Sequence, residues 1–153
     1  MSRKGTRQAT LPRLPTGVVT FVFTDIEGST RLLQRLGDAY VHLLDDHNRI
    51  LRDAITEFGG VEVRPIGDAF FAVFSDAQGA VRAMVAAQLK LRSHNWPDEA
   101  GCRVRIGLHT GHATSTGDDY VGLAVHQASR ISDAGHGGQI LLSSTTADLV
   151  ADM

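Results

Sequence analysis

The sequence predicts an α+β fold: a ferredoxin-like βαββαβ core with additional helices over one face of a mainly antiparallel sheet. The order of strand-like and helix-like segments, with a β-hairpin signal in the middle, indicates this topology. Hydrophobic residues make up 42% of the 153 residues and charged residues 21%, which is typical of one folded domain rather than a disordered chain.

The hydrophobic pattern places each element of this fold. In chain order we expect a strand at 18–24, helices at 29–37 and about 38–58, hairpin strands at 61–66 and 69–74, a helix from 75 or 76, a strand at 102–111, a helix at about 121–134, a strand at 139–143 and a helix from 144. The strand at 102–111 alternates apolar and polar residues, so Arg105 is expected on the face away from the core. Pro65 places the first hairpin strand at a sheet edge or a bulge.

The N-terminal segment 1–16 is predicted to be a flexible basic tail, and the folded domain to cover 17–153. The tail carries Arg3, Lys4 and Arg7 without any acidic residue, and it is expected to be a solvated arm.

Charge, cysteine content and hydropathy exclude several classes of protein. The formal charge of −2 gives no reason to expect binding to nucleic acid or to an anionic membrane. A single cysteine, Cys102, excludes an intrachain disulfide, and no apolar run reaches the roughly 20 residues of a membrane helix. The N-terminus lacks the apolar core of a signal peptide, so we expect a cytoplasmic chain.

Two carboxylates are expected at one end of the sheet. Asp25 ends the first strand and Asp68 lies in the hairpin turn, so the two converge if the hairpin pairs beside that strand. Such a pair is a hard oxygen site suited to Mg²⁺ or Mn²⁺. Gly28, Ser29 and Thr30 begin the next helix, where backbone N–H groups and the helix dipole favour an anion. A nucleoside triphosphate needs both features, although a helix cap and a turn residue remain the structural alternative.

The segment 25–30, DIEGST, is also close to the Asp-x-Asp-Gly-Thr signature of haloacid-dehalogenase-like phosphatases. Glu27 stands where those enzymes have their second aspartate. The later Gly-Asp pair lies in a hairpin rather than after a parallel strand, which disfavours that interpretation.

Four blocks resemble the class III nucleotidyl (adenylate/guanylate) cyclase catalytic domain of bacterial, actinobacterial type. They are VTFVFTDIEGSTRLL, VRPIGDAFFAVF, VRIGLHTG and DDYVGLAVHQASRISDAGHGGQILLS, and the likeness covers about 17–150. The resemblance implies a lyase that converts ATP, less often GTP, into the 3′,5′-cyclic monophosphate and pyrophosphate. It also implies two divalent metal ions, Mg²⁺ or Mn²⁺, as cofactors.

The resemblance implies a role for several residues near the strand ends. Asp25 and Asp68 would bridge both metal ions, and the carbonyl of Ile26 would bind the second one. The amides of about 27–30, from Glu27 to Thr30, would hold phosphates, and Arg105 matches the phosphate-binding arginine of the family.

The resemblance also implies base-reading and transition-state residues. Asp119 matches the residue that accepts from the adenine amino group, and Arg64 stands at the position of the base-reading lysine. Arginine keeps the charge, but its planar fork also suits guanine, so GTP remains open. Arg130 matches the charge-stabilising arginine, and His126 stands four residues earlier on the same helix face, where many members have Asn.

In the family, one chain supplies the metal carboxylates and its partner supplies the base readers and the transition-state pair. This sequence carries both sets, which implies a head-to-tail homodimer with two shared sites. The alternative is a catalytically inert cyclase-homology module that dimerises or binds nucleotide. The C-terminal hairpin that family members usually carry, with its triphosphate-binding lysine, is expected to be absent from the domain 17–153.

Overall fold

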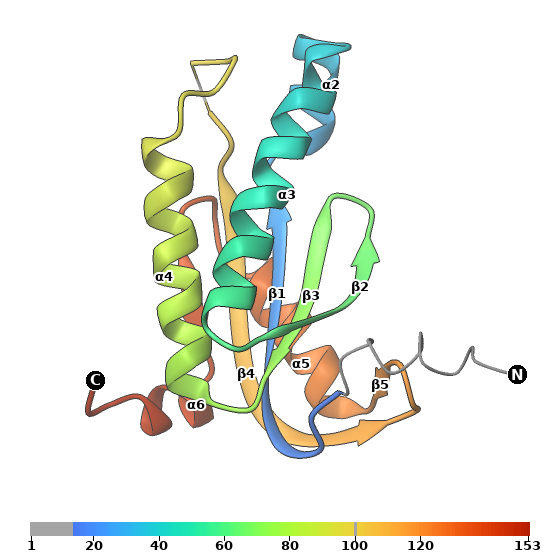
Figure 1. Ribbon diagram of the computed structural model, residues 1–153, viewed down its shortest axis with the longest axis vertical. Helices are drawn as coiled ribbons and strands as arrows, with labels where there is room; N and C mark the ends of the chain where they lie inside the picture. Colours follow the sequence, from blue (N-terminus) through green and yellow to red (C-terminus); the bar gives the residue numbers. More distant parts are fainter. Residues whose placement is uncertain (1–13, 100) are drawn as a thin grey trace, which may run out of the picture.

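A computed structural model describes residues 14–99 and 101–153, so most of the predicted tail lies outside the described residues (Figure 1). In chain order the elements are β1 (Gly17–Ile26), α2 (Ser29–Leu36), α3 (Ala39–Glu57), β2 (Val61–Ile66), β3 (Ala69–Phe74), α4 (Ala77–Ser93), β4 (Val104–Ser115), β5 (Tyr120–Val121), α5 (Leu123–Asp133), β6 (Ile140–Leu142) and α6 (Ser144–Leu149). Within residues 14–99 and 101–153, no helix combines the length and the apolar character that crossing a membrane requires.

The sheet confirms the predicted fold class. Its strand order is β2-β3-β1-β4-β5, and β6 pairs with β4. All pairings are antiparallel except that of β6 with β4, which is parallel. The ferredoxin-like core consists of β1, α3, β2, β3, α4 and β4. The edge strand β2 contains Pro65 and a register shift between Glu62 and Arg64, as the proline predicted.

Two hydrophobic clusters lie on the two faces of the sheet. On one face, α3 and α4 pack against alternate strand residues, with Val22, Leu51, Phe74 and Met84 fully or almost fully buried. This face forms the larger core, and Figure 1 shows α3 and α4 on the near side of the sheet.

Helices cover one face of the sheet, as predicted, and α5 in addition covers the opposite face. Ala128 of α5 packs there with Phe21, Phe71 and Tyr120. The close approach depends on Gly107 of β4, where an added Cβ atom would lie 2.3 Å from the backbone nitrogen of Ser132. Because both faces are covered, the first strand is mostly apolar on both faces, apart from the buried Thr20 and Thr24, rather than alternating.

Candidate active site

The end of β1 and the turn between β2 and β3 lie at the same end of the sheet, where these strands reach their upper ends in Figure 1. This arrangement follows from the antiparallel pairing of β1 with β3, in which Thr24 stands opposite Phe70. A hollow with a volume of about 460 Å³ opens there. It is lined by Asp25, Ile26, Gly28, Ser29, Thr30, Arg31, Gln34, Asp68 and Arg105.

Asp25 is held by Arg105 across the β1–β4 pairing, where the two residues stand directly opposite each other. The Arg105 Nε donates to Asp25 Oδ1 at 2.8 Å, and Nη2 donates to Oδ2 at 2.6 Å. Both side chains keep less than a third of their surface exposed, so this two-fold contact is partly shielded from solvent. The hydrogen bonds to Asp25 raise the pKa of Arg105, which therefore remains a cation.

Asp68 is contacted from the first turn of α3. The Tyr40 hydroxyl donates to Asp68 Oδ2 at 3.0 Å. Burial, followed by the negative charge of Asp68, raises the pKa of Tyr40 to about 12. The hydroxyl consequently keeps its proton at neutral pH and remains a donor.

The start of α2 leaves backbone N–H groups without a side-chain cap. Gly28 precedes the helix in the left-handed region, with φ 67°, and its carbonyl accepts the first helical bond from Leu32. Residues 28–30 all line the hollow, so the uncapped first turn lies at its wall. This is the usual arrangement of an anion site at a helix start.

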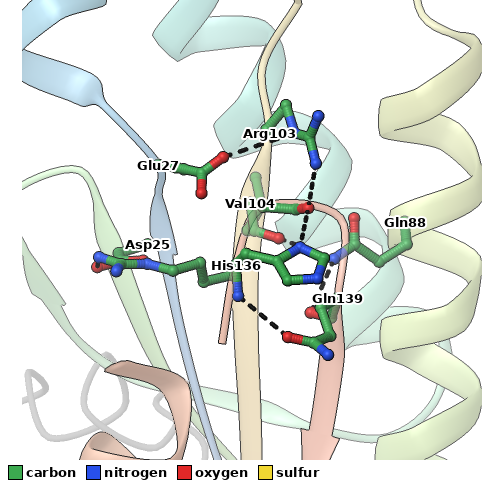
Figure 2. A network of polar contacts seen from close by, with 9 residues as sticks. Asp25, Glu27, Gln88, Arg103, Val104, His136 and Gln139 are labelled. Atoms are coloured by element: carbon green, nitrogen blue, oxygen red, sulfur yellow. Dashed lines mark hydrogen bonds and ion pairs between the residues drawn. The ribbon is translucent and has the colours of Figure 1, made fainter. Parts of the chain in front are cut away.

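Glu27 requires a correction to the predicted phosphate cradle. Its backbone N–H already donates to the Arg103 carbonyl at 2.7 Å, and the residue does not line the hollow. Its carboxylate lies 3.6 Å from Arg103 Nε, and Figure 2 shows it turned toward that guanidinium. Arg103 Nη2 in turn donates to the Gly137 carbonyl at 2.7 Å. Glu27 therefore ties β1 to the start of β4, and the amides left for a phosphate begin at Gly28.

The donors in the hollow fit a divalent cation such as Mg²⁺ or Mn²⁺. The carboxylates of Asp25 and Asp68 line it together with Ile26, whose carbonyl would be a second kind of hard oxygen ligand. Within residues 14–99 and 101–153, the hollow included, no group of three or more His, Cys, Asp or Glu side chains is arranged to hold a metal. Two carboxylates without a closed protein cage suit a cation that also binds substrate phosphates and water.

The predicted base readers are joined to each other away from the hollow. Arg64 Nε donates to Asp119 Oδ2 at 2.7 Å, and the guanidinium lies over the Phe71 ring at 5.3 Å from its centre. The other oxygen of Asp119 accepts from the Tyr120 backbone N–H at 2.7 Å. Neither Arg64 nor Asp119 lines the hollow.

His126 and Arg130 are exposed on α5, and they also lie outside the residues that line the hollow. In a single copy, the predicted site residues therefore fall into two groups, one inside the hollow and one outside it. Asp25, Ile26, Gly28, Ser29, Thr30, Asp68 and Arg105 share one hollow. Arg64, Asp119, His126 and Arg130 do not belong to it.

The sequence analysis missed three residues that contribute to this region. Arg31 and Gln34 line the hollow from one face of α2, and Tyr40 contacts Asp68. The spacing of Arg31 and Gln34, one helical turn apart and directly after the predicted cradle, was an available signal. Tyr40 gave no such signal, because its contact joins segments 28 residues apart.

Comparisons with known proteins identify the class to which this fold and site belong. The model of the adenylate and guanylate cyclase catalytic domain matches residues 12–153. An adenylate cyclase of Podospora anserina is 35% identical over 99% of this chain and 8% of its own length. An uncharacterized protein of Mycobacterium bovis is 41% identical over 89% of this chain and 46% of its own length. The chain belongs to the adenylate and guanylate cyclase catalytic domain family, as the resemblance indicated.

A solved structure supports the same assignment. A structure of adenylate cyclases from Trypanosoma brucei in their monomeric state superposes with a TM-score of 0.83 at 27% identity. The match covers 90% of this chain and 78% of that chain. The chain spans less than half the length of the two curated relatives named above, so it corresponds to one part of each.

Proposed function

We propose that this domain is an adenylate cyclase that forms 3′,5′-cyclic AMP and pyrophosphate from ATP in a site shared by two copies of the chain. The division of the predicted site residues is the observation that supports this proposal. One copy places two carboxylates, an uncapped helix start and Arg105 around one hollow, and it holds the base-reading pair elsewhere. A head-to-tail homodimer would bring the second group of one copy to the hollow of the other.

In the proposed reaction, the ribose 3′ oxygen attacks the α-phosphorus of ATP in line. The O3′–P bond forms, the bond from the α-phosphorus to the pyrophosphate oxygen breaks, and the 3′-hydroxyl proton passes to solvent. Asp25, Asp68 and the Ile26 carbonyl would hold two divalent cations. When bound, these cations would lower the pKa of the 3′-hydroxyl and stabilise the negative charge on pyrophosphate.

Arg105 can bind a phosphate without releasing Asp25. A guanidinium has five N–H donors, and Asp25 occupies two of them, one on Nε and one on Nη2. The remaining donors are available to a phosphate oxygen, next to the amides of Ser29 and Thr30. The same side chain would therefore orient a metal-binding carboxylate and bind the substrate.

The partner copy would contribute the groups on α5. Arg130 would stabilise the negative charge that develops as pyrophosphate leaves. His126, four residues earlier on the same helix face, would donate a hydrogen bond to the ribose ring or to a phosphate. Both side chains are exposed on one copy, as residues that serve a second copy need to be.

The Arg64–Asp119 pair supports the choice of a purine and leaves GTP as a second candidate substrate. Asp119 can accept from the adenine amino group while Arg64 donates to adenine N1. The planar guanidinium also suits guanine O6 and N7, so the pair could read guanine as well. The 2.7 Å contact between the two side chains keeps a donor and an acceptor side by side.

Product formation from each nucleotide tests the proposed function. Purified protein with Mn²⁺ is supplied with ATP or GTP, and cyclic nucleotide is measured. We expect cyclic AMP from ATP at the higher rate. A higher rate with GTP would favour the guanylate cyclase, and no product from either nucleotide would favour the inert cyclase-homology module.

A further inference from the structure

We propose that Tyr40 is a positioning residue that orients the Asp68 carboxylate for divalent-cation binding; this inference rests on the proposed function. The Tyr40 hydroxyl donates to Asp68 Oδ2 at 3.0 Å, from the first turn of α3 to the turn between β2 and β3. The contact connects a rigid helix to the tip of a hairpin.

The position of Asp68 makes such support necessary. The residue follows Gly67, which has φ 59°, at the tip of the hairpin, and it remains partly exposed. Among residues 14–99 and 101–153, no cation forms an ion pair with Asp68, and Tyr40 is its one side-chain hydrogen-bond donor. Asp25, in contrast, is held at both oxygens by Arg105. The two carboxylates of the hollow are thus oriented by different side chains, Asp68 by a tyrosine hydroxyl and Asp25 by a guanidinium.

Tyr40 is itself fixed in place. Its ring packs against the larger core, which includes Leu43 of the same helix and Phe70 of β3. A ring anchored in this way holds its hydroxyl at a defined point, so it restricts the rotation of the Asp68 side chain. Tyr40 donates to Oδ2 alone, so Oδ1 and the second lone pair of Oδ2 stay open to a cation. Hydrogen bonds of this kind to a ligating carboxylate commonly change metal affinity about 10- to 100-fold.

The variant Y40F tests the inference, because it removes the hydroxyl and keeps the packed ring. Mn²⁺ binding is measured without nucleotide, by the electron paramagnetic resonance signal of the free ion. We expect affinity to fall by about tenfold. In the cyclase assay, the Mn²⁺ concentration for half-maximal rate should rise, while the rate at saturating Mn²⁺ stays close to that of the wild type.

Y120F is the matched control. Tyr120 is the other tyrosine of the chain, and its hydroxyl donates to the Pro15 carbonyl rather than to a carboxylate. Y120F should leave Mn²⁺ affinity unchanged. Y40M, which also lacks the hydroxyl, repeats the test on a second side chain, and thermal unfolding without metal establishes that each variant is folded.

The outcomes separate this inference from the proposed function. Mn²⁺ binding by the wild type and its loss in D25N would support the metal site, whatever the result for Y40F. Unchanged or tighter Mn²⁺ binding in both folded Tyr40 variants would overturn the positioning role alone. Wild-type protein that binds no Mn²⁺ without nucleotide would overturn the positioning role, and cyclic nucleotide formation then tests the proposed function by itself.

Discussion

At the scale of single residues, Asp25 has a double role: it contacts Arg105 through both oxygens, and it is proposed to bind the metal ions. The variant D25N keeps the size of the side chain and removes its charge. We expect cyclase activity at saturating Mn²⁺ to fall at least about 100-fold, because a metal ligand and the orientation of Arg105 are lost together. Cyclic AMP formation measures the effect.

The control for D25N is E62Q, which removes the same charge from a surface pair with Arg52 outside the hollow. Its activity should equal that of the wild type. A D25N protein that keeps more than half of the wild-type rate would contradict a metal role for Asp25.

A second residue, His47, makes stability depend on pH. Its side chain is buried in α3 against Phe70, and its Nε2 atom has no hydrogen-bond partner among the described residues. Burial lowers the pKa of His47 below its ordinary value of 6.5, against an opposing hydrogen bond to Asn48. Because the folded-state pKa is the lower one, the stabilisation is complete above pH 6.5 and is lost as pH falls toward the folded-state pKa.

We therefore expect the free energy of unfolding to fall as pH decreases from about 7 to about 5.5, and to fall less steeply in H47L. Urea unfolding at several pH values measures both slopes. Part of the slope should remain in H47L, because burial also lowers the pKa of His109. Equal slopes in the two proteins would show that His47 is not responsible.

At the scale of elements, the packing of α5 on β4 depends on one missing side chain. A Cβ atom at Gly107 would lie 2.3 Å from Ser132 N and 2.6 Å from its Cα, and backbone atoms cannot move aside as a side chain can. G107A should lose about 2 kcal/mol of unfolding free energy by overpacking. It should also lower cyclase activity, because α5 carries Arg130.

G135A is the comparison for G107A. The three atoms nearest to an added Cβ atom at Gly135 all belong to side chains, at 3.2 Å or more, and side chains can adjust. Its loss of stability in urea should be clearly smaller. Equal losses in the two variants would contradict the close-approach explanation.

The sequence was most informative where one pattern decides one element. The alternation after Cys102 predicted β4 with Arg105 on the face opposite the larger core, and the Gly67-Asp68 turn predicted the hairpin. The sequence did not predict that α5 covers the second face of the sheet. Gly107 carries no apolar side chain, so its face of β4 does not look buried in the sequence. The mostly apolar sequence of β1, which indicates a strand covered on both faces, was the signal for this helix.

Part of the site could be predicted in the same way. Asp25 and Asp68 were placed at one sheet end from the order of the strands, and they line one hollow. Tyr40 and the engagement of the Glu27 amide by Arg103 could not be predicted, because both depend on contacts between distant segments. Strand order fixes which ends meet, but it does not fix which polar groups are already occupied.

At the scale of the whole molecule, one copy carries two separate sets of proposed site residues. The hollow holds Asp25, Asp68 and Arg105, while α5 presents Arg130 to solvent away from it. In a head-to-tail homodimer each site would draw on both copies, so a single defective residue on each copy could be compensated by the other. The proposed dimer therefore has a consequence that a site within one copy lacks.

Mixing two inactive variants tests this shared site most directly. D25A and R130A are each expected to be inactive alone. After subunit exchange, verified by co-purification of differently tagged copies, about half of the dimers should be mixed and should carry one intact site each. Cyclic AMP formation should then recover to about a quarter of the wild-type rate. No recovery despite verified exchange would contradict a site built from two copies.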